Sequence, residues 1–219
     1  KSGEHLRSTG IQGSGPGEFR SLYRARVLND DSILTYDAWL ERVSIFREDG
    51  TYVRPFHPDP PNDYRYFLIS ALRDGSIIGA TARPMAGVSG NGTMTDSSAI
   101  YLHDANGRLR DSIGNVLIMQ RIARTSGIYN SVRAIPFSPS GRYAVTGDKV
   151  CYGDGNGFEI NCYHRDGRPS HLIRVEMVPI QITSADLDSV RGRYGNIQDG
   201  PFPKHFPAFS SITGDDAGG

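Results

Sequence analysis

The fold is decided by the stretch Ile45-Phe46-Arg47-Glu48-Asp49-Gly50-Thr51-Tyr52-Val53-Arg54, where two apolar segments flank a polar turn that ends in glycine. Asp-Gly and Asn-Gly turns favour β-hairpins because both residues tolerate positive φ. Three other segments follow the same plan: Lys1-Ser2-Gly3-Glu4-His5-Leu6-Arg7, Leu102-His103-Asp104-Ala105-Asn106-Gly107-Arg108-Leu109-Arg110, and Cys162-Tyr163-His164-Arg165-Asp166-Gly167 continuing to Leu172-Ile173-Arg174. The four turn glycines lie 47, 57 and 60 residues apart, which indicates a repeated hairpin.

A second hairpin series alternates with the first. Its members are Val27–Leu34, Ala71–Ile78 and Pro136–Tyr143, and the tail Ile212–Gly218 resembles a fourth member that ends inside its turn. Each unit therefore holds two hairpins, or four strands, in roughly 45 to 65 residues, which is typical of a β-propeller blade. The sequence predicts an all-β fold, a β-propeller of four-stranded antiparallel blades.

The repeat also predicts the boundaries of the blades. They are the end of a preceding blade at 1–10, blades at 18–57, 64–114 and 130–175, an insertion at 178–206, and the start of a next blade at 207–219. A short helix is expected from Ser184 to Arg191, where Thr183 and Asp186 have the spacing of a capping box. Three complete blades with a partial blade at each end predict that the remaining blades are missing and that the chain is a fragment. The alternative is a partial propeller that a partner closes.

The first blade carries a family resemblance. Gly13-Ser14-Gly15-Pro16-Gly17-Glu18-Phe19, followed by Asp37, by Arg42-Val43-Ser44-Ile45-Phe46 and by Asp49-Gly50, resembles an NHL repeat over residues 10–56. The likeness is looser over 64–114 and 130–175. It implies a bacterial six-bladed propeller, of a kind that is often exported and of unassigned function. It also implies structural roles for Asp37, Arg42, Phe46 and Gly50, in which the Asp37 carboxylate binds turn amides and pairs with Arg42; a catalytic Asp37 is the alternative.

Composition excludes several classes of protein. The 24 basic residues balance the 24 acidic ones, so the chain lacks the electrostatic footprint of a nucleic-acid binder, although Arg121, Arg124 and Arg133 could form a local basic patch. No apolar run approaches the roughly 20 residues of a membrane-spanning helix. All but three of the basic residues are arginines, which suggests a GC-rich bacterial genome. Together with the resemblance, these features predict an extracytoplasmic protein: periplasmic, secreted or lipid-anchored.

Candidate ligand-binding residues lie on the first strand of each blade, which lines the channel of a propeller. Tyr23, Arg24 and Arg26 belong to blade one and Arg133 to blade three, and clustered arginines could receive an anionic ligand. The alternative is that each arginine pairs with an acidic side chain of a neighbouring blade. Trp39, in a hairpin turn, could stack on a ligand.

The remaining candidates concern cysteine and histidine. Cys151 and Cys162 flank a hairpin eleven residues apart, which makes a disulfide feasible; two packed thiols are the alternative. His103 shares with Phe46 and Tyr163 the position four residues before a turn glycine, so it is interpreted as a packing residue. The histidines lack metal-ligand spacing, and neither a metal nor a cofactor is expected.

These observations favour a non-enzymatic binding or scaffold propeller that presents loops on one face to a protein or an extracellular ligand. The alternative is a lactonase-type or lyase-type propeller enzyme, which would hold a metal in its channel with acidic and amide side chains.

Overall fold

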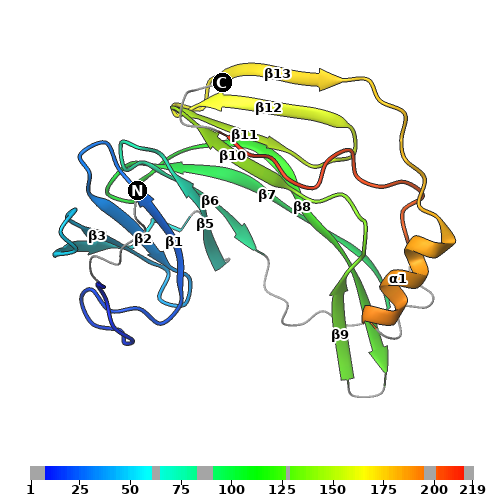
Figure 1. The fold of residues 1–219 in the computed structure, drawn as a ribbon, viewed down its shortest axis with the longest axis horizontal. Helices are drawn as coiled ribbons and strands as arrows, with labels where there is room; N and C mark the ends of the chain where they lie inside the picture. Colours follow the sequence, from blue (N-terminus) through cyan, green and yellow to red (C-terminus); the bar gives the residue numbers. More distant parts are fainter. Residues whose placement is uncertain (1–7, 61–64, 83–90, 127–128, 195–200, 215–219) are drawn as a thin grey trace, which may run out of the picture. The chain divides into compact units, whose positions relative to one another are not determined.

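The computed structural model describes residues 8–60, 65–82, 91–126, 129–194 and 201–214 (Figure 1). The described chain is all-β apart from one helix, as predicted. The strands are β1 (Leu22–Val27), β2 (Ile33–Asp37), β3 (Arg42–Phe46), β4 (Tyr52–Phe56), β5 (Arg65–Ala71), β6 (Ile77–Ala82), β7 (Gly92–His103), β8 (Leu109–Ser126), β9 (Tyr129–Ala134), β10 (Arg142–Thr146), β11 (Lys149–Gly153), β12 (Phe158–His164) and β13 (Pro169–Val175), and the helix is α1 (Ser184–Tyr194). The chain divides into a first unit, residues 1–81 and 101–112, and a second unit, residues 82–100 and 113–219.

The first unit contains a four-stranded antiparallel sheet in the order β1-β2-β3-β4. Its middle strands β2 and β3 are almost fully buried, and Leu34, Tyr36 and Val43 are each at most 1% exposed. β-Branched and aromatic residues suit such strands because they pack well on a pleated surface. Gly50 closes the β3–β4 turn at φ +79°, a conformation that favours glycine. The four strands lie inside the blade expected at 18–57.

Strands β5 and β6 pack against that sheet within the first unit. Tyr66 and Leu68 of β5 and Ile77 of β6 form one buried cluster with Leu34 and Tyr36 of β2. The Tyr36 hydroxyl donates a hydrogen bond to the Tyr66 carbonyl at 3.2 Å. Two successive sheets thus share an apolar layer, which is the way that propeller blades pack.

The next sheet differs from the predicted blade at 64–114. It has five strands in the order β5-β6-β7-β8-β9, and β7 and β8 belong partly to each unit. Residues 130–134, expected as the first strand of the third blade, lie in β9, which pairs with β8 from Arg121↔Ala134 to Ser126↔Tyr129. The prediction was wrong here because β8 continues to Ser126, and its long free edge offers β9 a partner immediately along the chain.

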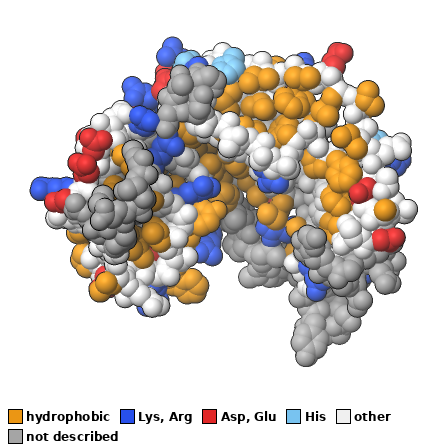
Figure 2. Space-filling model, in the orientation of Figure 1, with side chains coloured by type: hydrophobic (Ala, Val, Ile, Leu, Met, Phe, Trp, Pro, Cys, Tyr) orange, Lys and Arg blue, Asp and Glu red, His pale blue; other side chains and the backbone are white. Residues whose placement is uncertain are grey.

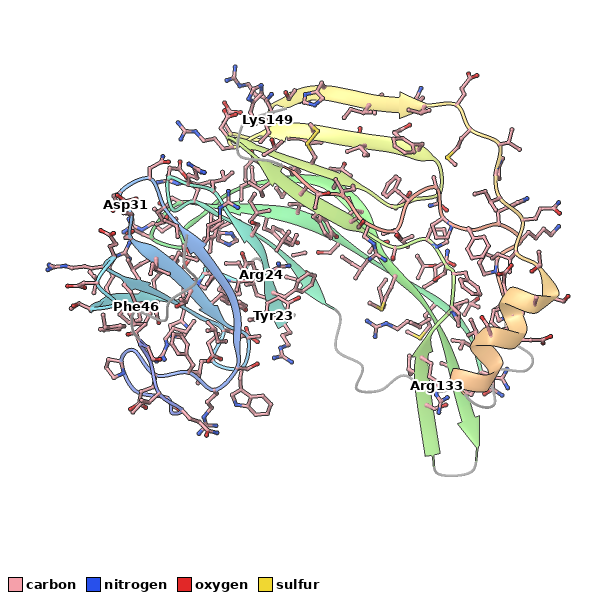
Figure 3. All side chains as sticks on the ribbon, in the orientation of Figure 1. Tyr23, Arg24, Asp31, Phe46, Arg133 and Lys149 are labelled. Carbon is pink, nitrogen blue, oxygen red and sulfur yellow. A yellow bond between two sulfur atoms is a disulfide. The ribbon has the colours of Figure 1, made fainter. Side chains whose placement is uncertain are left out.

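The third sheet lies in the second unit, with the antiparallel order β10-β11-β12-β13. It is a four-stranded unit, as the repeat predicts, but it begins at β10. Cys151 of β11 stands directly opposite Cys162 of β12. Their sulfur atoms are bonded at 2.03 Å, and Figure 3 draws this bond.

The segments outside the sheets match the prediction unevenly. Helix α1 begins at Ser184 as expected, and the Thr183 amide and hydroxyl both donate to the Asp186 carboxylate, at 2.8 and 2.6 Å. The start of a further blade, expected at 207–219, forms no strand over its described residues 207–214. The preceding blade expected at 1–10 lies mostly outside the described residues. In the part of the chain that the structure describes, no helix is both long and apolar enough to cross a membrane.

Candidate functional site

The predicted channel residues of the first unit lie on β1 and in the β2–β3 turn. Tyr23 and Arg24, labelled in Figure 3, are exposed on β1, and the Arg24 guanidinium carbon lies 5.1 Å from the centroid of the Tyr23 ring. Arg26 is half-buried on the same strand, and Trp39 is 65% exposed in the β2–β3 turn. Arg24 therefore stacks on its neighbour, and the ligand-binding role of these residues stays a prediction.

Arg133, also labelled in Figure 3, lies in the second unit on β9, where it is exposed. It stands opposite Ile122 of β8. Its strand pairs with β8 in the five-stranded sheet and does not begin a four-stranded one, and a ligand-binding role for Arg133 stays a prediction.

Asp37, the last residue of β2, binds backbone amides. Its carboxylate accepts hydrogen bonds from the amides of Arg20 and Ser21 at 2.6 and 2.9 Å and from those of Trp39 and Leu40 at 2.9 and 2.8 Å. The side chain is 1% exposed. Burial alone would raise its pKa, but the four amides hold the pKa below its ordinary value. Asp37 thus joins the β2–β3 turn to the residues that lead into β1.

Arg42, the residue opposite Asp37 in the sheet, binds carbonyl groups instead of that carboxylate. Its guanidinium donates to the carbonyls of Ser14, Gly15 and Glu18 at 2.9, 3.0 and 2.6 Å. Among the ion pairs of the described residues none joins Asp37 to Arg42, so the expected pairing was wrong. The two side chains together hold residues 14–21, the segment that leads into β1, which supports a structural role over a catalytic one.

His103 occupies the packing position that the sequence predicts. It is 2% exposed, and its ring lies edge-on to Tyr66 with the ring centroids 5.2 Å apart. Its Nε2 atom lies 3.0 Å from the Asp59 carbonyl, so the neutral ring carries its proton on Nε2. Burial lowers the pKa of His103, although the Asp59 carbonyl favours the protonated form.

A groove in the second unit is a further candidate site, which we call the β12–β13 groove. It encloses about 470 Å³ between the start of β12, the end of β13 and two segments that follow. Its lining residues are Asn156, Gly157, Phe158, Glu159, Arg174, Val175, Glu176, Met177, Pro179, Ile180, His205, Phe206, Pro207 and Ala208. Figure 2 shows hydrophobic side chains gathered over β12 and β13.

Backbone hydrogen bonds hold the walls of this groove together. The Phe206 amide donates to the Ile180 carbonyl at 2.9 Å, and the Ala208 amide donates to the Gly155 carbonyl at 2.8 Å. The Phe209 ring packs edge-on against Phe158, with centroids 5.6 Å apart. Residues about 25 to 50 positions apart in sequence thus build one concave surface.

Two charged side chains that line the groove, Glu159 and Arg174, form an ion pair. The Arg174 guanidinium donates two hydrogen bonds to one carboxylate oxygen of Glu159, at 3.0 and 2.7 Å. The hydrogen bonds from Arg174 have the largest effect on the Glu159 carboxyl, and a hydrogen bond from Asn161 has the next largest. Together they hold the pKa of Glu159 below its ordinary value. Both side chains are partly exposed, so they could exchange this contact for polar groups of a ligand.

The sequence predicted an insertion at 178–206 and the start of a blade at 207–219, and it favoured binding by inserted loops. No individual residue of these segments was predicted to bind a ligand. The Pro-rich and Phe-rich run Pro201-Phe202-Pro203-Lys204-His205-Phe206-Pro207 was the available signal. Its pairing with residues near Ile180 could not be deduced from spacing.

Comparisons with known proteins give weak likenesses. No protein-family model matches the chain, and no curated protein does so. Among solved structures, the chain is similar to a protein from Bacteroides fragilis that is named as an exported protein, with a TM-score of 0.38 and 15% identity over 90% of this chain and 76% of that one. It is also similar to a catalytically inactive virginiamycin B lyase from Staphylococcus aureus with quinupristin, with a TM-score of 0.32 and 13% identity over 79% of this chain and 47% of that one. A streptogramin B lyase gives a TM-score of 0.27 and 12% identity over 72% and 70% of the two chains. Likenesses of this strength transfer neither an activity nor a substrate.

Proposed function

We propose that this chain is a non-enzymatic binding module with a propeller-type architecture, and that the β12–β13 groove receives an apolar group of a protein or small extracellular ligand. The groove itself is the observation that carries the proposal. It has the size of a small-molecule site and combines apolar walls with a few polar groups, as such sites do.

The exposure of the groove supports this proposal. Val175, Met177 and Ile180 are 50%, 40% and 63% exposed, although they adjoin one another in space around the groove. A contiguous exposed apolar surface with a polar rim is typical of a binding site. The Glu159–Arg174 pair would then orient the polar end of the ligand.

An extracytoplasmic location is part of the proposal. The disulfide between Cys151 and Cys162 supports it, because disulfides persist in oxidising compartments. Membership of the NHL-like bacterial propellers, with six blades in the whole protein, is proposed on the resemblance of residues 10–56. The metal-dependent lyase alternative stays a prediction, which metal analysis of the purified protein would test.

Saturation-transfer NMR with N-acetylphenylalanine amide tests the groove. We expect transfer to the aromatic ring in the unmodified protein and a loss of about fivefold or more in Val175→Asp, because a carboxylate at that position opposes burial of an apolar group. Val27→Asp is the matched control, since Val27 lies on β1 in the first unit and is 58% exposed.

Transfer that is unchanged in Val175→Asp, or reduced equally in Val27→Asp, would contradict the proposal. N-acetylserine amide serves as the polar probe, and equal transfer to both amides would show that the surface does not select apolar groups. Both substituted residues are exposed, so the variants are expected to fold.

A further inference from the structure

We propose that reduction of the Cys151–Cys162 disulfide creates a binding site for a soft divalent cation such as Zn²⁺, with His171 as the third protein ligand. The two sulfur atoms and a ring nitrogen of His171 all lie within 4.8 Å of one another. None of these three residues lines the β12–β13 groove.

The sheet register places these three residues in a row. Cys151 of β11 is opposite Cys162 of β12, and Cys162 is opposite His171 of β13. Directly opposed residues of antiparallel strands point to the same face of the sheet. The three side chains therefore project together from three neighbouring strands, and a rigid hairpin scaffold holds them.

The burial of the three side chains suits a site that is closed on one side. Cys151 and Cys162 are 6% and 1% exposed, whereas His171 is exposed on β13 at the edge of the sheet. A cation can thus enter from the side of His171 and meet the sulfur atoms beneath. The Ser170 hydroxyl oxygen lies 3.0 Å from Nδ1 of His171, within hydrogen-bond distance. Because this contact occupies Nδ1, we assign Nε2 as the ligand atom.

The chemistry of the donors selects the cation. Two thiolates and an imidazole suit Zn²⁺ at distances of about 2.3 Å and 2.0 Å, and three protein ligands leave a fourth position for water. Hard cations such as Ca²⁺ and Mg²⁺ prefer oxygen ligands and would not compete.

The disulfide controls access to this site. A dithiol reductant transfers two electrons and two protons to the disulfide, so that the sulfur–sulfur bond breaks, two thiols form and the reductant becomes a cyclic disulfide. Binding of Zn²⁺ then releases both thiol protons to solvent, while neutral His171 contributes its lone pair. Reoxidation expels the cation because the bonded sulfurs are no longer thiolates.

Cobalt substitution tests the proposal with a spectroscopic signal. The protein is reduced with a dithiol, freed of reductant without oxygen and titrated with Co²⁺. We expect one equivalent to bind with intense thiolate-to-cobalt charge-transfer absorption, and Zn²⁺ to displace it. His171→Ala should weaken binding at least about tenfold. His164→Ala is the matched control, because His164 lies on the same sheet and contacts Asp148.

A second measurement avoids dependence on the folding of one variant. Zn²⁺ should slow alkylation of the two thiols in the reduced protein, and His171→Ala should lose this protection while its circular dichroism spectrum stays that of the parent. The proposal is overturned if the reduced protein gives no thiolate–cobalt absorption, if the oxidised protein binds Co²⁺ equally well, or if His171→Ala binds as tightly as His164→Ala.

Discussion

At the scale of single residues, aspartates organise the turns of the repeat. In seven turns of the described residues an Asp carboxylate accepts a hydrogen bond from the amide two residues later, over 2.8 to 3.2 Å: Asp30, Asp37, Asp49, Asp74, Asp104, Asp154 and Asp166. This Asx turn offers the backbone a local partner that mimics a β-turn. The hairpin series visible in the sequence is therefore a series of carboxylate-capped turns.

Asp37 is buried and adds three further amide contacts to this turn, and Asp37→Asn tests the importance of its contacts. The amide group turns a donor toward backbone N–H groups, so we expect the free energy of unfolding to fall by about 2 to 3 kcal/mol. Urea denaturation at pH 7 measures the change. The matched control is Asp30→Asn on an exposed turn, where a much smaller effect is expected; equal effects would show that Asp37 is not a special anchor.

The Asp37 carboxylate also makes the stability of the protein depend on pH. Because its folded pKa lies below the unfolded value of 3.8, its contribution to stability is present above that value. The contribution is lost as the pH falls through the folded pKa. The free energy of unfolding of Asp37→Asn should therefore decrease less steeply than that of the parent protein as the pH falls through this range.

His103 predicts a second pH effect at milder acidity. Its folded pKa lies below the ordinary value of 6.5, so its contribution to stability is complete above about pH 6.5 and declines as the pH falls toward the folded pKa. Denaturation at pH 7.5 and pH 5.5 should show a smaller difference for His103→Phe than for the parent protein, since the repeat places Phe46 at the equivalent position.

His57→Phe is the control for this comparison, because it makes the same substitution at an exposed histidine. An equal difference between the two pH values in His103→Phe and in the parent would show that the buried imidazole does not sense pH.

At the scale of elements, β7 and β8 are joined within the second unit by an ion pair. Asp96 and Arg121 lie 2.7 Å apart, and their side chains are 13% and 15% exposed. Removing one partner leaves the other charge largely buried, so we expect Asp96→Ala to reduce the free energy of unfolding by about 3 kcal/mol. Thermal and urea denaturation would measure this.

The exposed pair Arg65–Glu41, 3.4 Å apart and 59% and 40% exposed, provides the comparison. Glu41→Ala should change stability by less than about 1 kcal/mol. If Asp96→Ala were equally mild, the ion pair would not stabilise β7 against β8.

The edge strands explain where the element predictions succeeded and failed. Hairpin turns with Asp and Gly marked β3–β4, β7–β8 and β12–β13 in the sequence. The sequence could not show that β8 would extend to Ser126, because the length of β8 depends on whether a further strand pairs with its edge. β9 does so, and the third four-stranded sheet starts one strand later than predicted.

At the scale of the whole molecule, the chain forms two compact units, and each unit has buried residues of its own. The first unit has the layer around Leu34, Tyr36, Tyr66 and Ile77. In the second unit the segment that follows α1 returns to the β10–β13 sheet and forms a wall of the groove. The 24 basic residues balance the 24 acidic ones over the whole chain.

The sequence by itself determined the all-β class, the repeated hairpins, the packing role of His103 and the start of α1, because each follows from local turn chemistry or from side-chain alternation over a few residues. The tertiary structure decided which strands pair, that Arg42 binds carbonyls instead of Asp37, and that residues 176–180 and 205–208 form a groove with β12 and β13. These features join residues far apart along the chain. Their energies depend on three-dimensional packing and on competition for hydrogen-bond partners, and neither can be deduced from spacing.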